Sequence, residues 1–246
     1  MKFGKGRTPF LINNGYCPTC DSKTTFYSKN EWLRDFYLCK NCKSLPRERA
    51  LMFCLEQSYP EWRNLHIHES SPSFRGASVK LKKQCRNYIS SNYFPDFPLG
   101  EIHPSGFRNE NLEQQTFPDE SFDLVVTQDV MEHIFHPARA FSEIERVLKP
   151  GGAHIFSVPL VNRDRPSEER ARRNSDGTIA YTAEPEYHGD PLNEKGSLVT
   201  MQWGYDICDF IHEQSGLFTT IHVIDNISLG IRAEYIEILI SRKKNR

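Results

Sequence analysis

The chain has 246 residues, of which 38% are hydrophobic, and a formal net charge of -1. This length suffices for one medium α/β domain with a small appendage, and the balanced charge argues against a generally basic surface that binds nucleic acid. The sequence contains no run of eighteen apolar residues, and its polar N-terminus does not resemble a signal peptide. We therefore expect a cytoplasmic protein without a membrane partner.

Four of the seven cysteines form two CxxC pairs near the N-terminus. Eighteen residues separate the pairs, a spacing typical of a four-cysteine zinc ribbon. Four thiolates complete the tetrahedral coordination of Zn²⁺, so we expect a structural ion and not a catalytic one. So small a unit has little core, and the metal is expected to supply its folding energy. The predicted ligands are Cys17, Cys20, Cys39 and Cys42.

The predicted ribbon occupies residues 1–45 and enters the domain of residues 46–246 without a Gly/Ser-rich linker. It is therefore expected to pack on that domain and not to move freely. Its role is left open, because a ribbon can bind nucleic acid, bind a protein, or only support the domain behind it. The odd number of cysteines, four of them spaced for metal, favours a reducing compartment.

A helix is predicted directly after the ribbon. Ser44 is expected to cap it and Pro46 to open it. Arg47 and Arg49 could meet an anionic ligand, but we expect them to be solvated. The buried stripe of this helix is predicted to contain Leu51, Cys54 and Leu55.

Two short strands are predicted next. Leu65 and Ile67 alternate with polar residues, as in a strand that leads into a polar turn. His66 and His68 in this strand are expected to be core or rim residues and not metal ligands. Residues 87–92 predict a second strand that ends at an asparagine.

Residues 122–159 change their periodicity twice. Residues 122–127 form an apolar run typical of a buried parallel strand. A helix follows, with Pro137 in its first turn and apolar residues along one face, and Pro150-Gly151-Gly152 are expected to end it. Residues 153–159 then predict another strand. The segment therefore predicts a strand, a crossover helix and a parallel strand.

The carboxyl ends of parallel strands are where ligands bind in α/β sheets. The polar tripeptide Thr127-Gln128-Asp129 stands at the end of the first strand of this unit. It is therefore a candidate ligand-binding edge.

Residues 160–200 are polar and lack periodicity. A structureless segment of this length is usually a lid or a binding loop, and it leaves the carboxyl end of a central strand, so we expect it to arch over the pocket. Tyr187 and His188 are its predicted catalytic or substrate-recognising residues. Five arginines would suit an anionic group on a substrate, or are solvated beside acidic neighbours; they are Arg163, Arg165, Arg170, Arg172 and Arg173.

The C-terminal part predicts a helix and two strands. The helix is expected from Tyr205 to Gly216, and the strands at residues 218–225 and 234–243. The two strands are expected to form an antiparallel pair at one edge of the sheet.

The stretch FPDESFDLVVTQDVMEHIFHPARAFSEIERVLKPGG, residues 117–152, resembles the central signature of class I S-adenosylmethionine-dependent methyltransferases, with closest likeness to the small-molecule type. The CxxC pairs and the Ser-Leu-Pro-Arg-Glu-Arg sequence after them resemble a subset of these enzymes that carries an N-terminal zinc ribbon. The resemblance implies a Rossmann-like α/β domain with a mostly parallel seven-stranded sheet. It also implies S-adenosylmethionine as cofactor, beside the structural Zn²⁺.

The resemblance further implies where the cofactor binds. Asn92 matches the residue that meets the ribose hydroxyls, Asn111 matches the side chain on the adenine amino group, and Leu112 supplies the backbone N–H to the adenine ring. Gln128 stands at the ligand edge. The family's glycine-rich first turn is absent, because His68, Ser70 and Pro72 occupy the glycine positions.

Two interpretations of this missing turn stay open. Either the pocket is reshaped, so that Glu69, Ser70 and Ser71 contact the methionine end of the cofactor, or the fold has lost the cofactor. We favour the first, because the other contact positions match the family in residue type.

Glu132-His133 stands at the family's Glu-His position beside the reaction site. His133 either acts as a base or substrate clamp, or only hydrogen-bonds to the backbone. The expected function is methyl transfer from S-adenosylmethionine to an oxygen, nitrogen or carbon atom of an unidentified acceptor. The alternative is a non-catalytic module that binds nucleic acid or protein through the ribbon on a degenerate methyltransferase scaffold. A nicotinamide-dependent enzyme is disfavoured, because no GxGxxG follows a strand.

Overall fold

The computed structural model describes residues 10–190 and 193–245. Its centre is a seven-stranded sheet with the spatial order β15-β16-β8-β7-β4-β5-β6. Neighbouring strands are parallel except at β16, which runs antiparallel to β8 and β15. The strands are β4 (His66–Ser70), β5 (Asn87–Asn92), β6 (Arg108–Asn109), β7 (Phe122–Gln128), β8 (Leu148–Ser157), β15 (Phe218–His222) and β16 (Ile238–Arg242). The predicted mostly parallel seven-stranded sheet, with its antiparallel closing pair, is confirmed.

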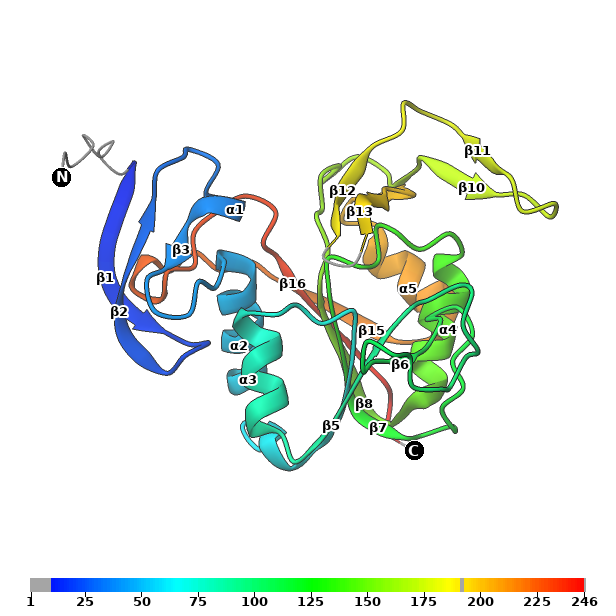
Figure 1. Cartoon of the computed structure of the whole chain (residues 1–246), viewed down its shortest axis with the longest axis horizontal. Coiled ribbons are helices and arrows are strands. Elements are labelled where there is room, and N and C mark those ends of the chain that lie inside the picture. Colours follow the sequence, from blue (N-terminus) through cyan, green and yellow to red (C-terminus); the bar gives the residue numbers. More distant parts are fainter. Residues whose placement is uncertain (1–9, 191–192, 246) are drawn as a thin grey trace.

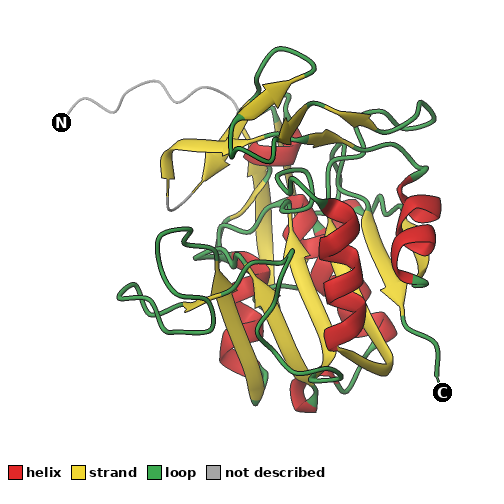
Figure 2. Cartoon of the chain, turned by 90° about the vertical axis from the view of Figure 1, so that its right-hand side faces the viewer, coloured by secondary structure: helices red, strands yellow, loops and turns green. Residues whose placement is uncertain are grey.

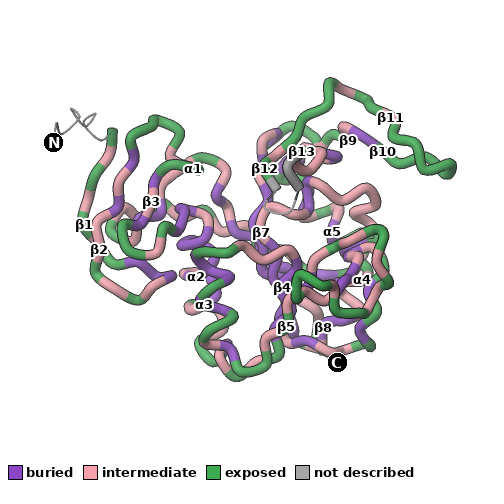
Figure 3. Tube along the Cα trace, viewed as in Figure 1, coloured by how far each residue is buried: buried purple, intermediate pink, exposed green. Residues whose placement is uncertain are grey.

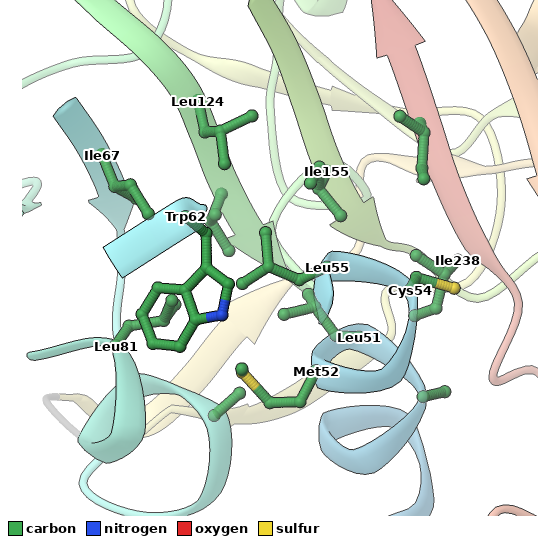
Figure 4. Close-up of a cluster of buried hydrophobic side chains, with 14 of the residues drawn as sticks. Leu51, Met52, Cys54, Leu55, Trp62, Ile67, Leu81, Leu124, Ile155 and Ile238 are labelled. Carbon is green, nitrogen blue, oxygen red and sulfur yellow. The ribbon is translucent and has the colours of Figure 1, made fainter. Parts of the chain in front are cut away.

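Helices cover both faces of this sheet, as Figures 1 and 2 show. Because alternate side chains of a strand point to opposite faces, Leu124 and Val126 of β7 enter one hydrophobic cluster and Val125 enters the other. Figure 4 shows the first cluster, around Trp62. The helices α2 (Pro46–Ser58) and α3 (Gly76–Gln84) pack on that side, and α4 (Pro137–Val147) and α5 (Ile207–Ser215) on the other. None of the helices within the described residues has the length and apolarity needed to span a bilayer.

The N-terminal unit is a three-stranded antiparallel sheet, β1 (Leu11–Cys17), β2 (Ser22–Ser28) and β3 (Leu38–Cys39), with the short helix α1 (Leu33–Phe36). Its buried core consists of four residues, Cys17, Phe26, Tyr37 and Cys39. So small a core buries too little apolar surface to stabilise a fold alone. Residues 1–9 of the predicted ribbon lie outside the described residues.

Two buried cations join this unit to the rest of the chain. Arg49 is fully buried, and its guanidinium donates to the carbonyl oxygens of Gly230 at 2.7 and 2.9 Å and of Tyr37 at 2.8 Å. Lys80 of α3 is 3% exposed and donates to the carbonyl oxygen of Pro18 at 2.9 Å. The expectation that Arg47 and Arg49 are solvated is wrong: Arg49 is fully buried, and the side chain of Arg47 is only 17% exposed, because both face carbonyl or carboxylate oxygens.

The start of α2 differs from the expectation. Glu48 caps it, since its carboxylate accepts from the backbone N–H of Leu45 at 2.7 Å. Ser44 instead places its hydroxyl 3.2 Å from the sulfur of Cys42 and 3.5 Å from that of Cys17. Ser44 therefore supports the cysteine cluster and not the helix.

The boundary between α4 and β8 also lies earlier than predicted. The helix ends at Val147 and β8 begins at Leu148, which pairs with Phe122 of β7. Pro150-Gly151-Gly152 therefore lie within an irregular first part of the strand, where the register between β7 and β8 shifts.

The segment of residues 160–200 was expected to be structureless and is not. It contains β9 (Glu168–Glu169), β10 (Ala171–Arg173), β11 (Ile179–Tyr181), β12 (Tyr187–Asp190) and β13 (Asn193–Leu198), followed by β14 (Met201–Gln202). The strands β10 and β11 form a mostly exposed hairpin that projects from the molecule (Figure 3), and β12 and β13 form a second hairpin nearer the sheet. Polar strands of two to six residues carry little periodic signal, which is why the sequence did not predict them.

His68 and His154 are fully buried in the sheet. The Nε2 atom of His68 lies 2.8 Å from the hydroxyl of Ser91, and that of His154 lies 2.9 Å from the hydroxyl of Thr127. His66 lies at the rim beside Asp123. The interpretation of His66 and His68 as rim and core residues is confirmed.

Burial lowers the pKa of His68 and of His154 to about 3. The unfolded chain therefore binds more protons than the native chain at pH values below about 6.5, so stability falls as the pH falls. Each histidine should contribute up to about 1.4 kcal/mol per pH unit to this slope. We expect urea unfolding of His154→Gln between about pH 6.5 and pH 5 to give a smaller slope of the unfolding free energy against pH than the wild type gives, by up to this amount. The half-exposed His66, changed to Gln, is the control, and an unchanged slope in His154→Gln would contradict the buried neutral imidazole.

Candidate functional site

A cavity of about 940 Å³ opens at the carboxyl ends of the central strands. This is the edge at which ligands bind in α/β sheets, and the volume lies in the range of small-molecule sites. Figure 1 shows α1 and the β12–β13 hairpin on opposite sides of these strand ends. The sheet edge supplies Ser71, Asn92, Gln128 and Asp129, the N-terminal unit supplies Trp32, Arg34 and Asp35, and the hairpin segment supplies Glu186, Tyr187, His188, Gly189 and Ser197.

Two of the predicted cofactor residues, Asn92 and Gln128, line this cavity, whereas Glu69 and Ser70 do not and are buried beside it. The carboxylate of Glu69 accepts from Gln128 Nε2 at 3.0 Å and from the hydroxyls of Ser78 at 2.6 Å and Tyr88 at 2.7 Å. Burial raises the pKa of Glu69, and these donors oppose the shift. Glu69 therefore fixes the orientation of Gln128 and does not face the cavity itself.

The turn after β4 contains no glycine before Gly76. Ser71 adopts a left-handed backbone conformation with φ of 56°, and its hydroxyl donates to the amide oxygen of Asn92 at 3.3 Å. Gly76 also has φ of 56°, and a Cβ there would collide with the carboxylate of Glu48. Ser71 and Pro72 line the cavity and do not fill it. Gly76 is needed for the packing of α2 on α3 and not for a close approach to a ligand.

Asn111 and Leu112 lie outside the cavity lining. The amide oxygen of Asn111 accepts from the backbone N–H of Glu113 at 2.9 Å, and Leu112 is 4% exposed in a hydrophobic cluster. The predicted adenine contacts of these two residues stay predictions.

Asp129 is the centre of an ion network at the sheet edge. Its carboxylate lies 2.9 Å from Arg34 of α1 and 2.7 Å from Arg47 of α2, and accepts from the hydroxyl of Ser157 at 2.9 Å. Burial would raise the pKa of Asp129, but the two guanidinium groups lower it to about 2. Sequence reasoning missed Arg34 and misread Arg47, because no local pattern shows that residues about ninety positions apart meet.

The predicted catalytic residues come together on the hairpin side of the cavity. His133, Tyr187 and His188 all line it. The Nδ1 atom of His133 lies 2.8 Å from the carbonyl oxygen of Leu198, so the predicted backbone hydrogen bond is present, yet the ring still borders the cavity. Glu132, which sequence reasoning noted only as a neighbour of His133, is 2% exposed, and its carboxylate lies 3.7 Å from both rings. This carboxylate raises the pKa of His188, although burial alone would lower it.

The five arginines of residues 160–200 lie outside the cavity lining. Among the described residues, none of the five belongs to the cavity lining. Arg163 pairs with Glu234 at 3.3 Å, Arg170 donates to the carbonyl oxygen of Glu184, and Arg173 stacks on Phe135. The prediction of an anionic acceptor therefore finds no support at these positions.

The four predicted zinc ligands converge. All four sulfurs lie within 4.8 Å of one another, with Cys17 to Cys42 at 3.7 Å and Cys20 to Cys39 at 3.9 Å. Four thiolates about 2.3 Å from a tetrahedral ion would lie about 3.8 Å apart. All seven cysteines of the chain are free thiols. The cluster therefore fits a zinc ribbon.

Residues 79–156 match the model of the methyltransferase domain family. A Mycolicibacterium smegmatis protein with the name "Probable S-adenosylmethionine-dependent methyltransferase" is 44% identical over 52 residues, which are 21% of this chain and 20% of that protein. The dimethylglycine N-methyltransferase of Parasynechococcus marenigrum is 37% identical over 59 residues, 24% and 19% of the two chains. The alignment thus spans about a fifth of the length of these relatives.

Solved structures extend the likeness over most of the chain. An S-adenosylmethionine-dependent methyltransferase from Mesorhizobium loti superposes with a TM-score of 0.50 at 15% identity, covering 79% of this chain and 98% of that one. The 1,6-didemethyltoxoflavin-N1-methyltransferase of Burkholderia thailandensis, solved with bound S-adenosylhomocysteine, gives 0.51 at 11% identity, covering 81% and 79%. This chain has the methyltransferase fold. Its N-terminal four-cysteine unit and its β12–β13 hairpin segment both line the cavity.

Proposed function

We propose that the protein transfers a methyl group from S-adenosylmethionine to an acceptor bound in the 940 Å³ cavity. The observation that carries the proposal is the position of this cavity, at the carboxyl edge of a methyltransferase-type sheet and beside Asn92 and Gln128. The bound cofactor would supply an electrophilic methyl group on a sulfonium.

The residues of this chain would bind and orient the two reactants. Asn92, whose amide oxygen already accepts from Ser71, would use its amide N–H on the ribose hydroxyls. Gln128, whose amide nitrogen donates to Glu69, would direct its amide oxygen toward the ammonium group of the methionine end. His133, Tyr187 and His188 would hold the acceptor, and the hairpin would exclude water from the reacting atoms.

We also propose that the four cysteines bind a structural Zn²⁺, since their sulfurs already stand at tetrahedral spacing. A reducing compartment, the cytoplasm, suits seven free thiols and belongs to the same proposal. The acceptor is unidentified, and binding of nucleic acid through the ribbon is a separate possibility that the same titrations can address with oligonucleotides.

The first experiment is calorimetric titration of the zinc-loaded protein with S-adenosylmethionine and S-adenosylhomocysteine. Micromolar binding is expected. Asn92→Ala should weaken it about tenfold, which corresponds to about 1.4 kcal/mol. Asn87→Ala, at the exposed start of the same strand, is the matched control. Asn111→Ala in the same titration tests the predicted adenine contact.

A second candidate function is a binding module on a scaffold without cofactor, favoured by the absence of the family's glycines at His68, Ser70 and Pro72. No binding of either ligand to the folded protein would support it and would refute methyl transfer.

A further inference from the structure

A cluster of three metal-binding side chains lies where the β12–β13 hairpin meets the turn after β7. We infer that Glu132, His133 and His188 bind one divalent transition-metal ion at this point. The inference does not depend on methyl transfer, because it rests on the cluster itself and its test does not involve the cofactor.

The donor atoms already stand at the spacing of a metal site. The Nε2 atom of His133 and the Nδ1 atom of His188 each lie 3.7 Å from Glu132 Oε1, and one ligand atom from each of the three residues lies within 4.8 Å of the others. Ligands bind Zn²⁺ at about 2.0 to 2.2 Å, so two ligand atoms on one ion lie about 3 to 4 Å apart. A small movement of one rotamer would complete the coordination.

The carboxylate of Glu132 supplies independent support. Its side chain is 3% exposed, and within the described residues neither of its oxygens has a hydrogen-bond partner. A buried carboxylate without donors is strongly destabilising unless a cation compensates it. Buried charges in proteins are generally paired or bound to a metal, and a metal between Glu132 and the two imidazoles would satisfy this group.

The outer contacts of both imidazoles are those of metal ligands. His133 donates from Nδ1 to the carbonyl oxygen of Leu198 at 2.8 Å, which leaves the lone pair of Nε2 directed to the cluster. On His188, Nδ1 faces Glu132, while Nε2 lies 3.5 Å from a carboxylate oxygen of Glu186. Metal-binding histidines usually bond their second nitrogen to a carbonyl or carboxylate, which fixes the ring and its tautomer.

The backbone also holds the two halves of the cluster together. The carbonyl oxygen of Glu132 accepts from the N–H of Thr200 at 2.8 Å, and the hydroxyl of Thr200 donates to the carbonyl oxygen of Ile134 at 2.7 Å. The chain after β13 is thus anchored to the turn that bears Glu132 and His133. The C-terminal end of the hairpin that carries His188 is therefore fixed to this turn.

The ligand set indicates the class of ion. Two imidazoles and one carboxylate suit Zn²⁺, Mn²⁺, Fe²⁺ or Co²⁺ and differ from the all-thiolate set of the N-terminal unit. Three protein ligands leave coordination positions open, and His133 and His188 border the cavity. An oxygen or nitrogen atom of a ligand in the cavity could occupy such a position.

The test uses the full chain loaded with one zinc, freed of weakly bound ions, and titrated with Mn²⁺ and with Co²⁺. Electron paramagnetic resonance reports bound Mn²⁺, and visible absorption reports bound Co²⁺, while the zinc content is followed by mass spectrometry. One additional ion per chain is expected for at least one of the two metals. Glu132→Gln and His188→Ala should each weaken its binding at least about tenfold and leave the zinc content unchanged.

Matched controls are Glu168→Gln and His222→Ala, which change the same residue types on β9 and β15, outside the cluster. Both should bind the additional ion as the wild type does. Because Glu132 is buried, His188→Ala, whose side chain is 38% exposed, keeps the test valid if Glu132→Gln fails to fold. The inference is overturned if neither ion binds at about 1 mM, or if His188→Ala and the controls bind equally. Failure to bind S-adenosylmethionine would refute the proposed methyl transfer and would leave this result untouched.

Discussion

Cys39→Ser should release most of the zinc and lower the free energy of unfolding by at least about 3 kcal/mol. Among its described residues, the N-terminal unit has only four in its buried core, two of them cysteines of the cluster, so little else there can hold β1, β2 and β3 together. Unfolding of this unit would also leave the buried charges of Arg49 and Lys80 without partners, because both side chains donate to carbonyl oxygens of the unit. Zinc content and thermal unfolding measure both effects.

The effect should extend to the cavity. Trp32 and Arg34 belong to the N-terminal unit and line the cavity, so the variant should also bind S-adenosylmethionine more weakly than the wild type. Cys208→Ser, a half-buried cysteine of α5 outside the cluster, is the control and should keep its zinc. Unchanged zinc content in Cys39→Ser would exclude the ribbon assignment.

Asp129→Asn should destabilise the protein by about 3 kcal/mol, because it leaves Arg34 and Arg47 without their shared carboxylate. The pKa of Asp129 is about 2 in the folded chain, below its unfolded value. The stabilising effect is therefore fully present above about pH 4 and is lost as the pH falls through about 2. The difference between variant and wild type in urea unfolding should accordingly be the same at pH 7 and pH 5.

A suitable control is Asp225→Asn. Asp225 also pairs with an arginine, Arg232, at 2.7 Å, but its side chain is 61% exposed. Water screens such a pair, so Asp225→Asn should lower the free energy of unfolding by less than about 1 kcal/mol. If Asp129→Asn and Asp225→Asn lower the free energy of unfolding equally, the ion network around Asp129 stabilises the fold no more than an exposed ion pair does.

Local patterns predicted the helices α2, α4 and α5, six of the seven strands of the central sheet and the cysteine cluster. The apolar run of β7 predicted a buried strand, because both of its faces pack against helices and such a strand is mostly apolar on both faces. The paired CxxC spacing predicted the convergence of four sulfurs, because each pair places two cysteines on one short turn. These features depend on residues that are neighbours in the chain.

The candidate site was predicted only in part. Asn92, Gln128, His133, Tyr187 and His188 line the cavity as the resemblance and the strand ends suggested. Glu69 was expected at the cofactor, but it points away from the cavity and holds Gln128. The direction of a side chain at a strand end depends on which donors surround it, and the donors around Glu69 come from α3, β5 and β7.

What the sequence determined by itself was therefore the type and order of most elements of the central sheet and of the helices α2, α4 and α5, because their periodicity and their turn residues are local properties. The tertiary structure alone decided which charges meet: Arg34 joins Asp129 across 95 positions, and the hairpin brings His188 to Glu132 across 56 positions. Such contacts depend on how the units pack, since a buried charge is stable only beside a partner supplied by another element. For that reason the residues that wall the cavity and the proposed metal site could be identified only from the tertiary structure.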